Sequence, residues 1–110
     1  MLAIVGGYIE PGETPLAAAQ RELCEETGYT SNQWHSLGDY LVDPNRGVAH
    51  GYLFLARSAR KEFDVKSDDL EEQQVVLLSR DELDEALSRG EFKILAWAAT
   101  VSFALRLLSR

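Results

Sequence analysis

The chain has 110 residues, 45% of them hydrophobic and 26% charged, which is the composition of a soluble globular protein. This length leaves no room for two independent cores, so we expect one domain over residues 1–110. The formal net charge of −7 excludes binding to long nucleic acid, because no basic stripe could neutralise a row of phosphates. A small anionic ligand is still compatible with this charge, since a divalent cation can bridge carboxylates to phosphates.

Cysteine usage and the apolar segments predict where the protein resides. Cys24 is the single cysteine and cannot form an internal disulfide, which favours a reducing cytoplasm. The most apolar stretch, residues 94–108, is shorter than a membrane span of about 20 residues and is interrupted by polar side chains. The first five residues lack the basic start and the long apolar region of a signal peptide. We therefore expect a cytoplasmic protein without a membrane partner.

The first quarter of the chain predicts a short strand and a helix. Residues 2–5 are apolar and end at a glycine pair, which predicts a strand followed by a loop over residues 8–12. Thr14 followed by Pro15 is a typical helix start, with a hydroxyl N-cap and then a proline whose missing N–H costs nothing there. The predicted helix covers residues 15–27 and ends at Gly28, which can adopt the left-handed conformation.

The middle of the chain predicts strands and a charged loop. Residues 34–42 and 49–56 favour two strands joined by a turn over residues 43–47. Residues 57–69 are polar and charged, and they predict an exposed loop. Residues 73–78 predict another strand that leads directly into the next helix.

The last third of the chain predicts two helices. Ser79 and Glu82 have the spacing of a capping box at the start of a short helix. After Gly90, apolar residues at helical spacing predict a final helix over residues 93–108. The order of strand, helix, strands, helix and helix predicts the α/β class, an α+β domain with a mixed sheet, and excludes a helical bundle.

Three carboxylates of the first predicted helix gather on one surface. Glu22 and Glu26 are four residues apart and Glu22 and Glu25 three apart, which are spacings of neighbours on a helix. A solvated acidic face, partly offset by Arg21, accounts for this arrangement as well as a metal site does. Hard divalent cations such as Mg²⁺ or Mn²⁺ favour clustered oxygen ligands and are the functional alternative.

A longer pattern decides between these alternatives. From Gly7 to Tyr29 the chain reads G-x5-E-x7-R-E-U-x-E-E-x-G-U, where U is apolar or aromatic, and every fixed position is filled. This pattern resembles the complete Nudix box, and nine specified positions over 23 residues make a chance match very improbable. The resemblance implies a Nudix-type fold, a mixed β-sheet flanked by helices, and metal-dependent hydrolysis of a nucleoside diphosphate linked to another group.

The resemblance also implies roles for the matched positions. Glu22, Glu25 and Glu26 would bind Mg²⁺, or Mn²⁺, with Glu26 the most important of them. The backbone carbonyl of Gly7 would add a ligand, and Gly6 and Gly7 would let the chain fold tightly near the metals. Arg21 would orient the glutamates by ion pairing, and Glu13 would support the geometry between loop and helix.

Other residues are candidates outside the box. In relatives a general base often comes from a glutamate in a later loop, and here we favour Glu71, with Asp69 and Glu72 as alternatives; an ordinary charged loop is equally compatible. Tyr8, next to the glycine pair, could stack on a base. Arg46 could reach a phosphate from its turn, although a plain exposed turn explains it equally well.

Outside the box the chain is most similar to the ADP-ribose pyrophosphatase branch, on residues 51–56 and on the tail from Ser79 to the last helix. This similarity implies hydrolysis of an ADP-sugar to AMP and a sugar phosphate. The alternatives are a nucleoside triphosphate substrate and a catalytically silent binding module.

The box also starts close to the first residue, without the strands that usually precede it. Either the chain is part of a longer one, or a second chain completes its sheet edge. Because an uncovered apolar edge favours pairing, we predict a homodimer.

Overall fold

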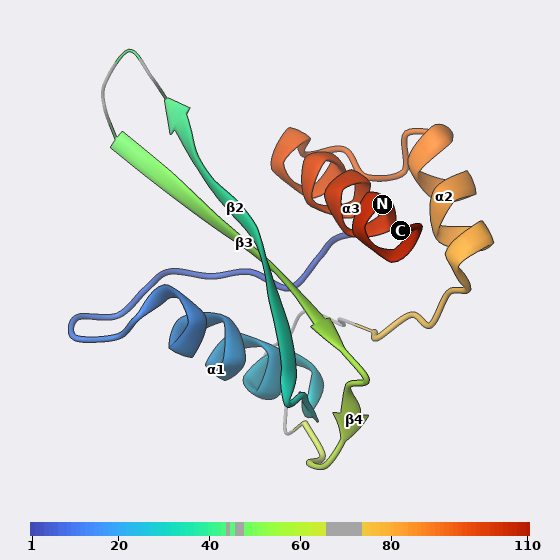
Figure 1. Ribbon diagram of the computed structural model, residues 1–110. Coiled ribbons are helices and arrows are strands. Elements are labelled where there is room, and N and C mark those ends of the chain that lie inside the picture. Colours follow the sequence, from blue (N-terminus) through green and yellow to red (C-terminus); the bar gives the residue numbers. More distant parts are fainter. Residues whose placement is uncertain (44, 46–47, 66–73) are drawn as a thin grey trace.

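The computed structural model describes residues 1–43, 45, 48–65 and 74–110 (Figure 1). Helix α1 precedes all the described strands, and α2 and α3 follow them. The described strands form two antiparallel pairs, β1 with β4 and β2 with β3. This arrangement confirms the α+β class. The elements in order are α1 (Pro15–Thr27), β1 (Tyr29–Thr30), β2 (Gln33–Asp43), β3 (Val48–Arg57), β4 (Arg60–Lys61), α2 (Arg80–Ser88) and α3 (Leu95–Leu108).

Helix α1 has the predicted bounds because both of its ends are capped as expected. The Thr14 hydroxyl accepts a hydrogen bond from the Ala17 backbone N–H at 3.1 Å, and Pro15 occupies the first turn. At the other end Gly28 has a φ of 75° and donates its N–H to the Cys24 carbonyl at 2.9 Å. These caps fix the length of the helix that carries the acidic residues.

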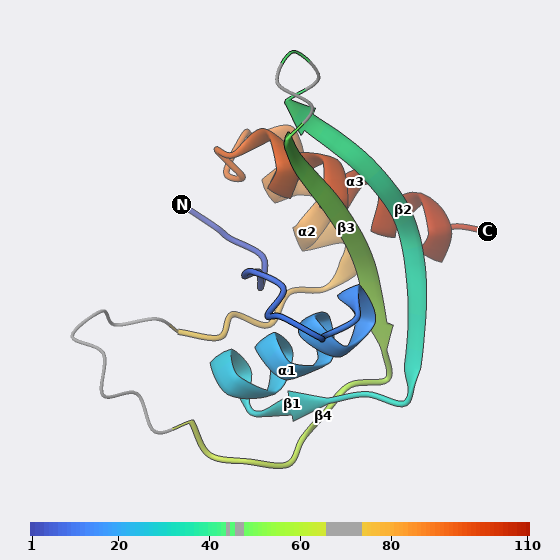
Figure 2. The same cartoon turned by 90° about the vertical axis from the view of Figure 1, so that its left-hand side faces the viewer.

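Strands β2 and β3 form a long, curved hairpin. Its register pairs Trp34 with Ala56 and Asp39 with Tyr52, and the register shifts between Ser36 and Gly38. Each strand of the hairpin extends one residue further at both ends than the sequence predicts. Figure 2 shows β3 as the inner strand, facing the N-terminal segment and the helices, and β2 as the outer strand.

One short strand pair was not predicted from the sequence. Within the stretch expected to be a plain loop, β4 pairs with β1 directly after α1. The Gly28 carbonyl holds the next turn by accepting hydrogen bonds from the backbone N–H groups of Glu62 at 2.9 Å and Phe63 at 3.1 Å. Two-residue strands have no recognisable hydrophobic periodicity, so sequence patterns do not reveal them.

Two predicted strands, over residues 2–5 and 73–78, are not formed in the part of the chain that the structure describes. Residues 2–5 make only a one-residue parallel bridge, in which Leu2 is paired with Phe92 and donates its N–H to the Glu91 carbonyl at 3.0 Å. Residues 74–78 are not part of a strand, and Val75 to Leu78 keep 37–77% of their surface exposed. A strand needs a hydrogen-bonding partner, and the described residues supply none beside this segment.

The two C-terminal helices form the packed part of the molecule. The capping box before α2 is confirmed, because Ser79 Oγ accepts from the Glu82 N–H and Glu82 Oε1 accepts from the Ser79 N–H. Helix α3 begins at Leu95, two residues later than predicted, since Ile94 is extended and has no capping side chain. No helix in the described ranges is long and apolar enough to cross a membrane.

A small hydrophobic core lies between the N-terminal segment and these two helices. Its buried centre consists of Ala86, Phe92 and Val101, and Leu2 and Ile4 pack against it. The first residues of the chain are therefore anchored on the helical pair before they continue towards α1 (Figure 1).

Candidate active site

The glycine pair that precedes α1 lies against the acidic face of that helix. A methyl group added at Gly7 would collide with the carboxylate of Glu22, so the backbone and this side chain are in close contact. The backbone of Gly6 lies close enough to the Glu26 carboxylate to lower the pKa of that group. The structure thus brings together residues that are separated by 15 to 20 positions in the sequence.

Arg21 connects the loop to the helix through a forked contact with Glu13. Its Nε donates to Glu13 Oε2 at 2.8 Å and its Nη2 to Oε1 at 3.1 Å. Nη2 also donates to the Tyr8 backbone carbonyl at 3.0 Å. Such a two-point arginine–carboxylate contact fixes direction as well as distance. Through Arg21, Glu13 and the Tyr8 carbonyl are thus connected to helix α1.

The same guanidinium binds two of the three box glutamates that lie on α1. Arg21 Nη1 donates to Glu22 Oε1 at 2.8 Å and to Glu25 Oε2 at 3.2 Å. The Glu22 side chain keeps only 16% of its surface exposed, whereas that of Glu25 keeps 60%. Arg21 therefore controls where both carboxylates point.

These contacts also set the charge states of Arg21 and Glu13. The pKa of Glu13 is lowered, first by the hydrogen bond from Arg21 and second by the N–H of Glu10, which donates to Glu13 Oε1 at 3.0 Å. The pKa of Arg21 is raised, chiefly by its hydrogen bond with Glu13, so the guanidinium stays charged. Both groups remain ionised at any physiological pH.

Glu26 has the opposite electrostatic environment. Partial burial raises the pKa of its carboxyl, the negative charge of Glu22 raises it further, and the hydrogen bond from the Gly6 backbone only partly opposes these effects. Arg21 donates no hydrogen bond to Glu26 among the described contacts. An ionised carboxylate in this position favours a nearby cation.

These residues fit a divalent cation by their chemistry. Three carboxylates from one helix and the backbone beside them supply the all-oxygen donor set that Mg²⁺ and Mn²⁺ prefer. Over the described ranges, however, no three acidic, histidine or cysteine side chains are gathered to hold one ion as they stand. Arg21 binds the carboxylates of Glu22 and Glu25 in this structure, so holding one ion with both of them would require these side chains to turn.

A cavity of about 650 Å³ opens beside Glu22. One wall comes from the N-terminal segment and α1 and includes Gly7, Tyr8 and Glu22, while β3 supplies the facing wall with His50 and Tyr52. Apolar side chains from β3, α1 and α3 line much of the interior. A volume of this size is typical of small-molecule sites.

Comparison with known proteins decides the family. Residues 1–98 match the model of the NUDIX domain family. The chain is a member of the Nudix family. The matched region includes the whole pattern from Gly7 to Tyr29, so the Nudix box lies where the structure joins the N-terminal segment to α1.

Two curated relatives are similar to most of this chain. The methanol dehydrogenase activator of Bacillus methanolicus is 34% identical over 87 residues, which cover 79% of the chain and 46% of that protein. Nudix hydrolase 19, chloroplastic, of Arabidopsis thaliana is 32% identical over 96 residues, which cover 84% of the chain and 22% of that protein. The Nudix domain thus spans less than half the length of either relative.

The structure brings some of the predicted site residues together, while others lie outside the residues it describes. It gathers seven of them at one place, namely Gly6, Gly7, Glu13, Arg21, Glu22, Glu25 and Glu26. Tyr8 lies at the same cavity with a residue exposure of 93%. Arg46 and Glu71 lie outside the described residues, as do Asp69 and Glu72, so their roles stay predictions.

Two residues that line the cavity, His50 and Tyr52, were not recognised as site residues from the sequence. Asp39 Oδ1 and His50 Nε2 are 2.8 Å apart, and the rings of His50 and Tyr52 are stacked with centroids 4.9 Å apart. His50 and Tyr52 are two residues apart on a strand, so the period of two was the signal that could have placed them on one face. The strand had to be paired with β2 before Asp39 could be added to them.

Proposed function

We propose that this Nudix domain hydrolyses the diphosphate bond of a nucleoside diphosphate derivative. The preferred substrate is an ADP-sugar such as ADP-ribose, which would give AMP and a sugar phosphate. The observation that carries the proposal is the placement of Glu22 and Gly7 of the box in the lining of a cavity of about 650 Å³. A ligand of this kind combines a charged diphosphate with less polar ends, which suits a carboxylate edge joined to an apolar interior.

The proposed metal ligands are Glu22, Glu25 and Glu26 with the Gly7 carbonyl. A bound divalent cation would neutralise the diphosphate and lower the pKa of a coordinated water. The protein's own contribution is positioning: Arg21 holds Glu22 and Glu25, and Glu13 holds Arg21 at two points. If the two glutamates bound a metal instead, the contact with Glu13 would keep the guanidinium in place.

A general base is required to take a proton from the attacking water. We propose Glu71 for this role, with Asp69 and Glu72 as the alternatives. Support comes only from the chemistry of the segment, which offers several carboxylates shortly before α2. Single substitutions of each residue to its amide would identify the base, because only one of them should reduce turnover by several orders of magnitude.

Two other functions need separate tests. A nucleoside triphosphate would also place phosphates on the box carboxylates and a base in the cavity. A catalytically silent binding module is favoured by one finding, the similarity to a protein named as a methanol dehydrogenase activator. In a silent module the Arg21–Glu22–Glu25 contacts would be a permanent arrangement, and the metal would have no effect on bound nucleotides.

The decisive experiment is a magnesium-dependent hydrolysis screen. The substrates are ADP-ribose, other nucleotide sugars, dinucleoside polyphosphates and deoxynucleoside triphosphates, and the Glu26→Gln protein is the control. We expect AMP to be released from ADP-ribose by the wild-type protein only. Preferred release of pyrophosphate from triphosphates would favour the second substrate class. Equal rates for the wild-type and Glu26→Gln proteins would contradict the mechanism.

We further propose a cytoplasmic homodimer. Strands β2 and β3 pair only with each other among the described residues, so both outer edges of the hairpin are available for pairing. Leu41 and Val42 on β2 are 57% and 62% exposed, and residues 75–78 are apolar and unpaired. A second copy could cover these surfaces. A size measurement in dilute solution that finds only monomer would contradict the dimer.

A further inference from the structure

Two of the aromatic side chains that line the cavity are tyrosines from different segments of the chain. Tyr8 lines it from the N-terminal segment and Tyr52 lines it from β3, while Gly7 and Glu22 belong to the same lining. Tyr8 is 93% exposed and Tyr52 41% exposed, so the described residues leave ring surface uncovered on both. Uncovered aromatic surface beside an anion site can take up a planar group of the ligand.

Tyr52 is held in place by a chain of contacts across the hairpin. Asp39 is the register partner of Tyr52, and its carboxylate lies 2.8 Å from Nε2 of His50. An ionised carboxylate can only accept, so Nε2 is the donor in this contact, which orients the imidazole ring. The fixed ring stacks on Tyr52 at a centroid distance of 4.9 Å and an interplanar angle of 27°. One face of the Tyr52 ring is therefore in contact with His50 in the absence of a ligand.

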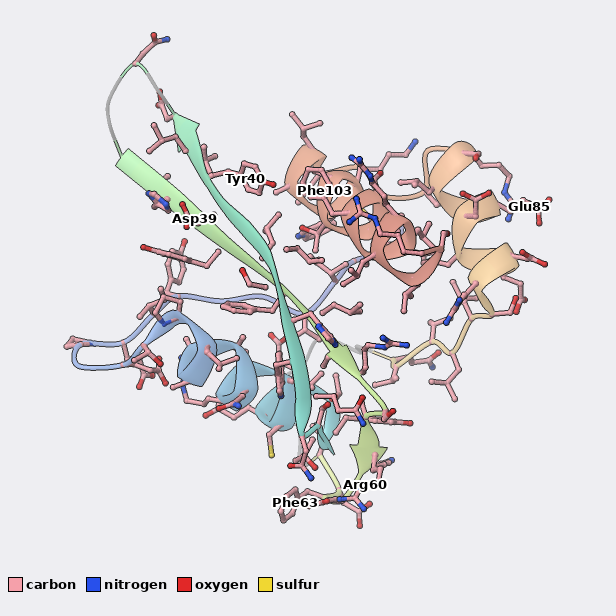
Figure 3. All side chains as sticks on the ribbon, in the orientation of Figure 1. Asp39, Tyr40, Arg60, Phe63, Glu85 and Phe103 are labelled. Carbon is pink, nitrogen blue, oxygen red and sulfur yellow. The ribbon has the colours of Figure 1, made fainter. Side chains whose placement is uncertain are left out.

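The tyrosine on the opposite face of the hairpin has a different use. Tyr40 stacks on Phe103 of α3 with centroids 5.5 Å apart, and its hydroxyl donates to the Leu37 carbonyl at 3.2 Å. Figure 3 shows Tyr40 pointing towards Phe103. It does not line the cavity, so its ring holds the hairpin against α3. On this hairpin, Tyr40 therefore packs against α3, whereas Tyr52 lines the cavity.

We propose that Tyr52, backed by His50 and Asp39, is the stacking surface for the nucleobase of the substrate, with Tyr8 contacting the base from the facing wall. This inference rests on the proposed function, because the ligand is the nucleoside part of the same substrate. Every base has an aromatic face, so the arrangement selects nucleotides over base-free phosphates and leaves the choice of base to other contacts. Tyr52 is a binding residue, and His50 and Asp39 position it.

The test is equilibrium binding of AMP and of ribose 5-phosphate, measured by calorimetry with magnesium present. Neither compound contains the bond to be hydrolysed, so the measurement does not depend on turnover. Stacking on one aromatic ring is worth about 1–3 kcal/mol, so Tyr52→Ala should raise the Kd for AMP by about 5- to 150-fold. Tyr52→Phe keeps the ring and should bind AMP within about twofold of the wild type.

Matched variants separate stacking from a damaged fold. Tyr40→Ala removes a ring from the same hairpin that does not line the cavity, and it should leave the Kd for AMP unchanged. Tyr8→Ala removes a ring that is almost fully exposed, and it should also raise the Kd for AMP without changing the Kd for ribose 5-phosphate. Under the proposal, Tyr52→Ala likewise leaves the Kd for ribose 5-phosphate at its wild-type value.

Three results would overturn the inference. They are unchanged AMP binding by Tyr52→Ala, equal losses of AMP and ribose 5-phosphate in that variant, and a wild-type protein that binds both compounds equally. If the wild-type protein binds AMP through Tyr52 but hydrolyses nothing in the screen, the stacking surface stands and the proposed hydrolase activity fails.

Discussion

Gly7→Ala is expected to damage the site while leaving the fold intact. A methyl group at this position would lie 2.8 Å from Glu22 Oε2 and closer still to the other carboxylate atoms. Because these atoms are the far end of a flexible side chain, the chain accommodates the methyl by moving the carboxylate by roughly 1 Å. A misplacement of this size can lower the rate by about 100-fold. The free energy of unfolding should change by less than about 1 kcal/mol, since no backbone has to move.

Gly6→Ala is the matched comparison. It alters the other member of the same glycine pair, but its methyl group would meet no atom within 4 Å, and its backbone N–H remains for Glu26. Surface changes without a collision are worth about 0.5 kcal/mol, so Gly6→Ala should retain activity within about threefold.

Two assays check this pair of variants. Magnesium-dependent release of AMP from ADP-ribose measures activity, and thermal unfolding measures stability. Mn²⁺ binding followed by electron paramagnetic resonance adds a readout that does not need turnover, and Gly7→Ala should bind Mn²⁺ more weakly than Gly6→Ala. Equal activity and equal Mn²⁺ affinity in the two variants would refute the argument that Gly7 sets the position of Glu22.

Three further predictions concern the ends of the helices and the charge on Glu26. Glu26→Gln should abolish turnover yet stabilise the metal-free protein at neutral pH. The raised pKa of Glu26 means that the folded wild-type protein favours the protonated carboxyl, so the wild type loses stability as pH rises through that pKa. Urea unfolding should therefore show a difference in stability between variant and wild type that vanishes at low pH. Gly28→Ala should destabilise more than Gly12→Ala in thermal unfolding, because both positions have positive φ, worth about 1–2 kcal/mol, but only a methyl at residue 28 meets the Phe63 carbonyl; equal losses would contradict this. Ser79→Ala should cost about 1 kcal/mol by removing the N-cap of α2, and chemical denaturation with an unchanged midpoint would disprove it.

Local signals in the sequence were sufficient for the helix that carries the chemistry. Thr14, Pro15 and Gly28 act within one turn of the helix ends, so their effect does not depend on the rest of the fold. The same holds for the capping box of α2. The spacing of Glu22, Glu25 and Glu26 predicted a shared surface for the same reason, because helical geometry alone determines it.

Features that depend on a partner segment could not be obtained in this way. Residues 2–5 and 74–78 have the composition of strands, but strand formation needs a neighbour with free hydrogen-bonding groups. The hydrogen bonds of Arg21 with Glu22 and Glu25 could not be predicted either, because the sequence shows the opposite charges without showing which carboxylates the guanidinium binds. The contact between Asp39 and His50 required the register of the hairpin.

The N-terminal segment acts as a short mechanical tether. One end is fixed at Leu2, against the core around Phe92, and the other end, at Gly7, lies on Glu22. Only four residues lie between these attachments, so a displacement of the C-terminal helices should move Gly7 and with it the carboxylate of Glu22. Suppressor substitutions that rescue Gly7→Ala should therefore arise around Leu2 and Ile4, at a distance from the acidic helix itself.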